Sequence, residues 1–464
     1  MHRRSFLIGA SGLTLVAVSA CTSPQPTPTP TVTPTPTPEL AVPRPARMAR
    51  SSWGADPYAG GAFSYLGIGS TPDQRNTLAT SVADRLFFAG EATSIALPGT
   101  VVGAQQTGVR AAIEVAVVAT PGERIAVIGA GVAGATAARH LTDAGSTVTV
   151  LEARTRTGGR IDTTTDSDWP MPVELGAGFL DSVSAAATEA TLTALGVITV
   201  ALAPETSTRT PDGLEVTPST IGAETVKAAI AAALPLPGDI TIATALLGFP
   251  APDPTPGEGG VSPADWVNEY LRNDLQLRFG AGADELSAKY ALTDGTRTVD
   301  RIVLGGFAKL VSEALDGIDV WTSNVVSRIA HDENGVNLRF ATGESLQVDR
   351  VIVTVPLGVL KARSILFEPQ LPLTHIVATT TLEMGTVDKI WVEFDEPFWS
   401  TDAVRWSVAG GDLDITEWVN LQPATGSPVL IGLVGGERAA AIAELDDDQV
   451  VDRARRSLEP FLTA

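Results

Sequence analysis

The sequence predicts an α/β protein of two domains, one of them built on a parallel sheet. An apolar, β-branched run at residues 124–128 has the pattern of a buried parallel strand. A glycine-rich turn at 129–134 follows at once, and then come a helical pattern at 135–144 and a second apolar run at 147–151. Strand, turn, helix and strand in this order are typical of a parallel α/β sheet. The chain has 464 residues, of which 44% are hydrophobic, which is enough for two to three domains of about 100–200 residues each.

The glycine-rich turn has the spacing of a dinucleotide-binding site. Gly129 permits the tight turn, Gly131 lets the backbone approach a pyrophosphate, and Gly134 lets the helix pack closely. The helix N-terminus offers unpaired N–H groups to the phosphates. Glu152 ends the second strand, where an acidic side chain accepts hydrogen bonds from the adenosine ribose hydroxyls. We therefore expect Gly129, Gly131, Ala133, Gly134 and Glu152 to bind a dinucleotide.

The residues after the second strand favour FAD over NAD. Residues 154–160, which end in Gly158-Gly159-Arg160, resemble the Gly-Gly-Arg extension of glutathione-reductase-like flavoproteins. In those proteins the arginine neutralises the FAD pyrophosphate, so the resemblance implies that Arg154, Gly159 and Arg160 contact the cofactor. The alternative is a solvated basic turn without a ligand. The predicted fold class is thus α/β, with a Rossmann-type FAD domain and a second, mixed α+β substrate domain.

Composition argues against several other classes of function. The chain has 32 Lys and Arg against 53 Asp and Glu, a net charge of −21, so nothing favours binding to the phosphates of DNA or RNA. A single Cys rules out a disulfide framework. The four His stand at positions 2, 140, 331 and 375, without the spacing of a metal site. We expect neither a nucleic-acid partner nor a bound metal.

The N-terminal residues predict export and tethering. Residues 1–20 have a basic start and an apolar stretch too short to span a bilayer, as in a signal peptide. Residues 3–7 resemble a twin-arginine export motif, and residues 18–21 resemble a bacterial lipobox, which implies lipidation of Cys21. Residues 21–43 form a Pro/Thr-rich linker that favours extended polyproline II. This predicts a protein anchored by lipid to the outer face of the bacterial cell membrane, and the alternative is an ordinary cleaved signal with an incidental Cys.

A second set of motifs lies in the C-terminal half. A strand pattern leads into Thr354-Val355-Pro356-Leu357-Gly358, and further short motifs follow in a fixed order. Together they resemble the flavin-containing amine oxidase family, which includes monoamine oxidases, polyamine oxidases and lysine-specific histone demethylases. The resemblance runs from residue 124 to the C-terminus and is weakest over about 185–280. The motifs that carry it are residues 305–306, Val326, 349–361, 365–369, 384–390 and 398–399.

The motifs that end this family's sequences stand near the beginning of this one. Residues 53–58, 61–65, 88–93 and 99–104 all precede the glycine-rich turn. We interpret this order as a circular permutation, in which the family's last helix, here at 107–118, runs into what is usually its first strand. A permutation is tolerated when the old termini lie close together and the new break falls in an exposed loop. The alternative is a fusion or gene fragment with a fortuitous match.

The resemblance implies roles for residues near the flavin. Lys389 stands where the family keeps a lysine bonded through water to flavin N5, and Phe63 stands at one aromatic wall of the substrate cage. Thr100 stands at the second wall, where monoamine oxidases have an aromatic side chain. Ala62 replaces the cysteine that attaches FAD in monoamine oxidases, which implies non-covalent FAD. The alternatives are a solvated strand charge for Lys389 and plain core packing for Phe63.

Further residues are implied as cofactor contacts. Gly90 and Glu91 match contacts of the ribityl–pyrophosphate region. Thr100 and Val101 open a helix whose N-terminal dipole faces the flavin C2 carbonyl and stabilises the anionic reduced flavin. The other implied contacts are Gly176 and Ala177 with the isoalloxazine edge and Val326 with the adenine.

The implied activity is FAD-dependent oxidation of an amine to an imine, which hydrolyses to an aldehyde or ketone, with reduction of O2 to H2O2. The partners are then a small-molecule amine and O2, and a homodimer is left open. Two other functions stay open: an FAD-dependent dehydrogenase or desaturase that uses another electron acceptor, and a non-catalytic flavin-binding lipoprotein. The missing second aromatic wall and a shortened substrate region favour the last of these.

The expected domain organisation follows the motifs. Residues 223–233 predict a helix over the substrate pocket, and the Gly/Pro-rich residues 249–260 predict a loop there. The expected segments are 44–118 (permuted flavin-binding segment), 119–180 (dinucleotide-binding core), 181–300 (substrate-domain helices), 301–360 (return to the FAD domain) and 361–464 (substrate-domain sheet and C-terminal helix).

Overall fold

The computed structural model of the protein describes residues 41–166, 168–202, 205–293 and 299–462. The predicted signal peptide, Cys21 and all but the end of the linker lie outside the described residues. Within the described part, no helix has both the length and the apolarity needed to cross a bilayer.

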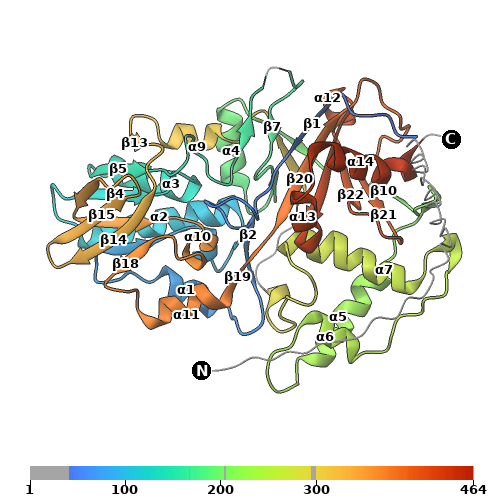
Figure 1. The fold of residues 1–464 in the computed structure, drawn as a ribbon, viewed down its shortest axis with the longest axis horizontal. Coiled ribbons are helices and arrows are strands. Elements are labelled where there is room, and N and C mark those ends of the chain that lie inside the picture. The colour runs from blue at the N-terminus through green and yellow to red at the C-terminus, as the bar shows by residue number, and fades with distance from the viewer. Residues whose placement is uncertain (1–40, 167, 203–204, 294–298, 463–464) are drawn as a thin grey trace, which may run out of the picture. The chain divides into compact units, whose positions relative to one another are not determined.

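A five-stranded parallel sheet carries the glycine-rich turn (Figure 1). The two strands predicted from the sequence are β4 (Arg124–Ile128) and β5 (Thr147–Leu151), which pair in parallel. Successive side chains of the sheet are buried in different clusters on its two faces, so both faces are covered. The strand order is β13 (Asp319–Trp321), β5, β4, β17 (Arg350–Val353) and β3 (Leu86–Phe88).

Helices α2 (Val101–Val118) and α3 (Val132–Asp143) pack together on one face of this sheet. They can approach closely because Gly108 has no side chain. A Cβ at this position would lie 2.3 Å from the carbonyl oxygen of Ala133. The predicted strand, turn, helix and strand are confirmed. Helix α2 opens at Thr100-Val101 as predicted, whereas α3 begins before residue 135, since Gly134, which disfavours a helix interior, is used here for close packing.

The other face of the parallel sheet is covered by a four-stranded sheet (Figure 1). Its apolar side chains share one buried cluster with β3, β4 and β17. Its strand order is β16 (Ser345–Val348), β15 (Gly335–Phe340), β14 (Val326–Asp332) and β18 (Leu366–Glu368).

A seven-stranded sheet forms the second main part of the fold. The predicted strand that contains Lys389 is β20 (Val387–Glu393), which pairs antiparallel with β23 (Val429–Gly435). Trp391, Trp406 and Trp418 are fully buried in the clusters on its faces. The strand order is β1 (Arg47–Arg50), β20, β23, β22 (Glu417–Asn420), β21 (Arg405–Val408), β10 (Thr206–Arg209) and β11 (Glu215–Val216).

The segment 44–118 contributes to both parts, whereas the sequence analysis assigned it to the flavin-binding part alone. In Figure 1, β1 (blue) lies along β20 (orange-red), and the two strands pair antiparallel. Next, β2 (Phe63–Leu66) pairs with β19 (Leu382–Gly385). The physical reason is that the edge of β20 has backbone N–H and C=O groups that need partners, which β1 supplies.

The helices expected at 181–300 are centred on α5 (Ile221–Ala233), which confirms the helix predicted at 223–233. It packs on α7 (Pro263–Glu269), where a Cβ on Gly222 would lie 2.0 Å from the carbonyl oxygen of Trp266. The predicted loop at 249–260 holds only the short 3₁₀ turn Glu258–Gly260. After α7 the chain continues as a π-helical segment, η3 (Tyr270–Gln276), and as α8 (Leu277–Phe279).

Shorter elements connect these parts. They are α1 (Asp73–Ala79), η1 (Glu91–Thr93), β6 (Thr163–Thr164), β7 (Val173–Glu174), β8 (Phe179–Leu180), α4 (Ala186–Ala194), β9 (Ile198–Ala201), α6 (Ile242–Leu247), η4 (Ala291–Thr293), β12 (Arg301–Leu304), α9 (Lys309–Ala314), α10 (Leu357–Lys361), α11 (Leu373–Thr381), α12 (Gln422–Thr425), α13 (Gly436–Ala443), α14 (Asp447–Leu458) and η5 (Glu459–Phe461).

Candidate active site

A cavity of about 750 Å³ extends from the glycine-rich turn to the seven-stranded sheet. Its wall combines the turn, the start of α2, the end of β14 and the inner face of the sheet. The segment that closes it near the substrate-domain helices is η3, whereas none of its lining residues belongs to α5. The expectation that the helix at 223–233 covers the pocket is therefore wrong. That helix is held away from the cavity by its packing against α7.

The glycine-rich turn forms a side-chain-free cradle at one end of the cavity. Gly129 has a positive φ of 108°, as the tight turn requires. A Cβ on Gly134 would lie 1.9 Å from the carbonyl oxygen of Gly129, so only glycine fits there. By contrast, a Cβ on Gly131 would meet only the carbonyl oxygen of Gly158, at 3.8 Å, and would otherwise occupy the cavity. Gly131 and Ala133 both line the cavity at the N-terminus of α3, which suits a pyrophosphate.

Glu152 lies beside this cradle and is buried. Its two carboxylate oxygens accept hydrogen bonds from the backbone N–H groups of Ala130 and Arg154, each at 2.8 Å. The carboxylate thus fixes the turn and still faces the cavity, where it has capacity for the hydroxyl groups of a ribose.

Of the three arginines in residues 154–160, Arg154 and Arg160 line the cavity, and both already have carboxylate partners. Arg154 forms an ion pair with Asp56 at 2.7 Å and lies over the ring of Tyr58. Arg160 donates from Nη1 to Glu91 at 2.8 Å and to the carbonyl oxygen of Ala62 at 2.9 Å. The segment is therefore not the solvated basic turn of the alternative interpretation, because both side chains are fixed at the cavity.

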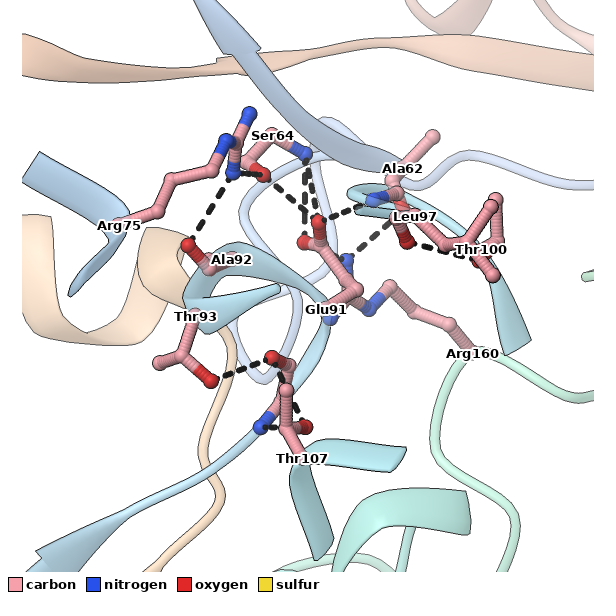
Figure 2. A network of polar contacts seen from close by, with 12 residues as sticks. Ala62, Ser64, Arg75, Glu91, Ala92, Thr93, Leu97, Thr100, Thr107 and Arg160 are labelled. Atoms are coloured by element: carbon pink, nitrogen blue, oxygen red, sulfur yellow. Dashed lines mark hydrogen bonds and ion pairs between the residues drawn. The ribbon is translucent and has the colours of Figure 1, made fainter. Parts of the chain in front are cut away.

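Glu91 is the centre of a buried polar network (Figure 2). Its carboxylate accepts from the hydroxyl of Ser64 at 2.7 Å and from the backbone N–H of Gly99 at 2.9 Å, in addition to Arg160. Burial alone would raise the pKa of Glu91, but the charges of Arg160 and Arg75 and the hydrogen bonds lower it to about 2. One ionised carboxylate thus connects β2, the start of α2 and the Gly-Gly-Arg segment.

The start of α2 faces the cavity. Thr100 is the N-cap residue, because its hydroxyl accepts from the backbone N–H of Gly103 at 2.9 Å and donates to the carbonyl oxygen of Leu97 at 2.8 Å. Thr100 and Val101 line the cavity, as do Phe63 and Gly90. The hydroxyl of Thr100 is therefore used for capping, and it supplies no aromatic wall.

Lys389 lies on the inner face of the seven-stranded sheet and lines the cavity. Its Nζ donates to the carbonyl oxygen of Glu174 at 3.0 Å and lies 4.8 Å from the ring centroid of Phe179. Burial lowers the pKa of Lys389 to about 8, while the charge of Glu174 acts in the opposite direction. The side chain is buried, so it is not the solvated strand charge of the alternative interpretation.

The remaining candidate residues are also on the cavity wall. Gly176 and Ala177 follow β7, and a Cβ on Gly176 would lie 2.0 Å from the carbonyl oxygen of Arg160. Val326 begins β14. Gly159 has a positive φ of 58°. Of the predicted cofactor contacts only Gly134 does not line the cavity, because it packs behind the turn. Ala62 lines the cavity with a methyl group, which rules out a cysteinyl link to a cofactor at this position.

The sequence analysis missed a group of charged residues at the far end of the cavity. Glu417 on β22 forms an ion pair with Arg405 on β21 at 2.7 Å, and Asp274 on η3 also lines the cavity. Burial raises the pKa of both Glu417 and Asp274. Burial and the charge of Asp274 raise the pKa of the neighbouring Glu269 to about 7. An acidic residue in the apolar pattern of residues 417–420 was the one signal that could have identified Glu417.

These features fit FAD rather than a metal. Among the described residues, no cluster of His, Cys, Asp and Glu could hold a metal ion. The side-chain-free cradle, the acidic ribose site and the arginine-rich loop lie along one elongated cavity. A dinucleotide that carries a flavin ring needs an arrangement of this kind.

Comparisons with known proteins agree with this geometry. The family described as "Flavin containing amine oxidoreductase" matches residues 37–116 and 269–463, and a "NAD(P)-binding Rossmann-like domain" matches residues 127–192. Polyamine oxidase 4 of Oryza sativa subsp. japonica is 31% identical over 367 residues, which cover 73% of this chain and 72% of that protein. Polyamine oxidase 2 of Arabidopsis thaliana is 29% identical over 360 residues, which cover 73% of this chain and 72% of that protein.

Solved structures share the fold. A putrescine oxidase variant from a structure-based redesign of cofactor binding has a TM-score of 0.58 at 22% identity, over 73% of this chain and 81% of that chain. Cyclohexylamine oxidase from Brevibacterium oxydans has a TM-score of 0.53 at 22% identity, over 73% of this chain and 80% of that chain. From the site and the family match together, we conclude that this chain is an amine-acting oxidoreductase that uses FAD and belongs to the flavin-containing amine oxidase family.

Proposed function

We propose that the protein is an amine oxidase that converts an amine to an imine, which water hydrolyses to an aldehyde or ketone, and that passes the two electrons to O2. Bound FAD supplies the redox chemistry, namely acceptance of a hydride from the carbon next to the amine nitrogen and reduction of O2 to H2O2. The observation that carries the proposal is the buried ammonium of Lys389 in the wall of the cavity that begins at the dinucleotide cradle. A fixed cation in a water-poor site stabilises the negative charge that develops on reduced oxygen.

The chain's own residues have separate roles in this proposal. Phe63 presents an aromatic side chain to the cavity and excludes water from the reacting carbon. The N-terminus of α2 at Thr100 and Val101 directs its positive end into the cavity, where it would stabilise negative charge on a bound flavin. The non-covalent mode of FAD binding is supported by Ala62.

The substrate that we propose is an amine with a second positive charge, such as a diamine or polyamine. Relatives named polyamine oxidases support this class. The charged group missed by the sequence analysis supports it too. In the antiparallel register, Lys389 lies opposite Leu433, and Leu433 lies opposite Glu417, and all three line the cavity. Neighbouring strands lie about 4.8 Å apart, so Glu417 is about 10 Å along the sheet from Lys389.

This far end brings three carboxyl groups close to Arg405, while Asp274 also interacts with the charges of Lys227 and Arg278. Arg405 is the partner of Glu417, while Asp274 and Glu269 add two further carboxyl groups nearby. The charges of all three acids raise the pKa of Arg405, which means that this location favours a positive charge. A distal ammonium group placed between Asp274 and Glu417 would relieve the repulsion between these carboxylates.

The test is an absorbance spectrum of the purified protein, followed by anaerobic mixing with monoamines, diamines, polyamines and amino acids, and then by air. Bleaching of a visible flavin band by diamines or polyamines, with H2O2 formed on admission of air, is the expected result. Fast bleaching followed by slow reoxidation in air would favour a dehydrogenase or desaturase. Bound flavin that no amine bleaches would favour a non-catalytic flavin-binding protein.

A circular permutation is our proposal for the order of the motifs. It is supported by residues 86–118. In this segment β3 adds to the parallel sheet beside β17, and α2 then leads directly into β4. It is also supported by Val42, which is buried in one cluster with Leu458 and Phe461 and accepts from Arg455 through its carbonyl oxygen. The two ends of the folded unit are therefore near each other. A variant opened at Pro121-Gly122 and joined from residue 462 to residue 42 should fold and bind FAD, and failure to bind FAD would contradict the permutation.

Export and lipid anchoring are proposed from the N-terminal motifs alone. Folded, cofactor-loaded export suits a cavity in which FAD is enclosed. Replacement of Cys21 by Ser should release the protein from the membrane fraction and abolish incorporation of a labelled fatty acid. Unchanged fractionation would favour an ordinary cleaved signal.

A further inference from the structure

Glu174 on β7 connects Lys389 with a turn of the dinucleotide-binding part. Its backbone carbonyl oxygen accepts from Nζ of Lys389 at 3.0 Å and from Nε1 of Trp391 at 3.2 Å. Its carboxylate accepts from the hydroxyl of Thr163 at 2.7 Å and from the backbone N–H groups of Gly306 and Phe307 at 3.1 and 2.8 Å. The residue is only 1% exposed, so each of these contacts is shielded from water.

The residues around Nζ restrict the position of the Lys389 ammonium group. A Cβ on Gly178 would lie 2.7 Å from Nζ, so a side chain at that position would displace the ammonium group. The ring of Phe179 lies on another side, at 4.8 Å from Nζ to the ring centroid. The carbonyl of Glu174 supplies the hydrogen bond that orients the group. Glu174, Gly178 and Phe179 therefore define this niche around Nζ.

Apart from Glu174, the charged groups that the structure describes on the strands around Lys389 interact with other partners. Glu417 and Arg405, on β22 and β21, belong to the same face of the sheet and pair with each other. Asp388 precedes Lys389 on β20, but its carboxylate accepts from the hydroxyl of Ser51 and the backbone N–H of Trp53. Glu174 is the acidic group whose charge raises the pKa of Lys389 against the lowering effect of burial. Burial in turn raises the pKa of Glu174, while its hydrogen bonds and Lys389 lower it.

We propose that Glu174 is a positioning residue that orients the Lys389 ammonium group through its backbone carbonyl and keeps it protonated through its carboxylate. The inference rests on the proposed role of Lys389 in reoxidation, but the protonation of Lys389 is measurable without turnover. With Glu174 ionised, Lys389 stays a cation at neutral pH, when electrons pass to O2. With a neutral residue at position 174, burial acts unopposed and Lys389 loses its proton at lower pH.

The experiment is a pH titration of the FAD-loaded enzyme labelled with ¹³C at lysine Cε. The sequence has only five Lys, at 227, 289, 309, 361 and 389, so the signals are resolvable, and Lys389→Met assigns the signal of interest. In Glu174→Gln the pKa of Lys389 should fall by about 1 unit, as expected for loss of a neighbouring opposite charge. The pH above which flavin reoxidation slows should move down by the same amount.

Matched variants separate charge from structure. Thr163→Val removes a hydrogen bond to the carboxylate but leaves its charge, and Asp388→Asn removes a buried carboxyl group that faces other partners. Neither should move the pKa of Lys389 by as much as Glu174→Gln does. Glu174→Asp, which keeps the carboxylate, should give a Lys389 pKa close to the wild-type value.

An unchanged Lys389 pKa in folded Glu174→Gln would overturn the proposal. If that variant does not fold, a wild-type Lys389 that is already neutral at pH 7 would overturn it as well. If the titration shifts while reoxidation does not, the role of Lys389 fails and that of Glu174 stands.

Discussion

Arg160 and the buried Glu91 form an ion pair, with 2.8 Å between Nη1 and the carboxylate, that joins the Gly-Gly-Arg segment to the N-terminal segment of the chain. The same carboxylate holds Ser64, which follows Phe63 on β2, and Gly99, which precedes the N-cap of α2. The aromatic side chain and the helix end that face the cavity are therefore fixed by a single acidic group. The pair also explains why Arg160 can lie at the cavity wall without being a free charge.

Replacement of Glu91 by Gln should strongly destabilise the protein. The change removes the anion that pairs with Arg160 and interacts with the charge of the buried Arg75, and breaking a buried pair typically costs about 3–5 kcal/mol. Urea unfolding and the ratio of flavin to protein measure the two consequences. Asp448→Asn is the control, because it removes an exposed pair with Arg44 and should change stability by less than about 1 kcal/mol. Equal losses in both variants would contradict the central role of Glu91.

Acid should destabilise the wild-type protein through the same residue. The pKa of Glu91 is about 2 in the folded protein and ordinarily 4.5, so its contribution to stability is fully present above about pH 4.5. That contribution is lost as the pH falls from there through 2. The free energy of unfolding, measured in urea between pH 7 and pH 3, should decline more steeply for the wild type than for Glu91→Gln. Parallel curves would show that the carboxylate is not stabilised in the fold.

Lys389→Met should slow flavin reoxidation by O2 while anaerobic reduction by the amine stays nearly as fast as in the wild type. The substitution keeps the length of the side chain but removes the buried cation from the cavity wall. Loss of one preorganised charged group usually costs at least about tenfold in rate. Stopped-flow absorbance follows the two half-reactions separately. Lys361→Met provides a matched control, since Lys361 pairs with Glu383 and does not line the cavity. Equal reoxidation rates in Lys389→Met and the wild type would refute the proposed role.

Much of the glycine-rich cradle could be predicted from local motifs. The charged residues at the far end of the cavity could not, because their positions depend on pairing between strands that are distant in the sequence. The glycine-rich turn could be predicted because Gly129 and Gly134 act within one continuous strand, turn and helix. Lys389 could be placed by its motif on a strand. The position of Glu417 could not, because it reaches the cavity only through the register of β22 with β23 and β20. Glu91 could be placed at the cavity by its motif, but its pairing with Arg160, 69 residues away, could not be predicted.

Two glycines of the cradle should respond differently to the same substitution. In Gly134→Ala the new methyl group would lie 1.9 Å from the carbonyl oxygen of Gly129, so the turn must move, and we expect poor folding and no FAD. In Gly131→Ala the methyl group would meet no atom closer than 3.8 Å, and we expect normal folding with FAD affinity lowered by about tenfold or more, since the methyl group points into the cradle. Circular dichroism reports folding, and fluorescence titration of the flavin-free protein reports affinity. Full FAD binding by Gly131→Ala would mean that the pyrophosphate lies elsewhere.

Glu417→Gln should raise the KM for diamines and polyamines while that for monoamines changes little. The proposed subsite then loses one of the two carboxylates that line the far end of the cavity, and Asp274 is left to neutralise Arg405 rather than a substrate ammonium group. A distal ammonium that loses a partly buried ionic contact typically loses about 10–100-fold in affinity. Asp412→Asn is the control, because the side chain of Asp412 is exposed and pairs with Arg438 away from the cavity.

The selectivity of the wild type should also depend on pH, since Glu269, with a pKa of about 7, gains its negative charge as the pH rises through that value. The ratio of kcat/KM for a diamine to that for a monoamine should therefore increase between pH 6 and pH 8. If Glu417→Gln leaves this ratio unchanged, this end of the cavity is excluded as the site that binds the second charge.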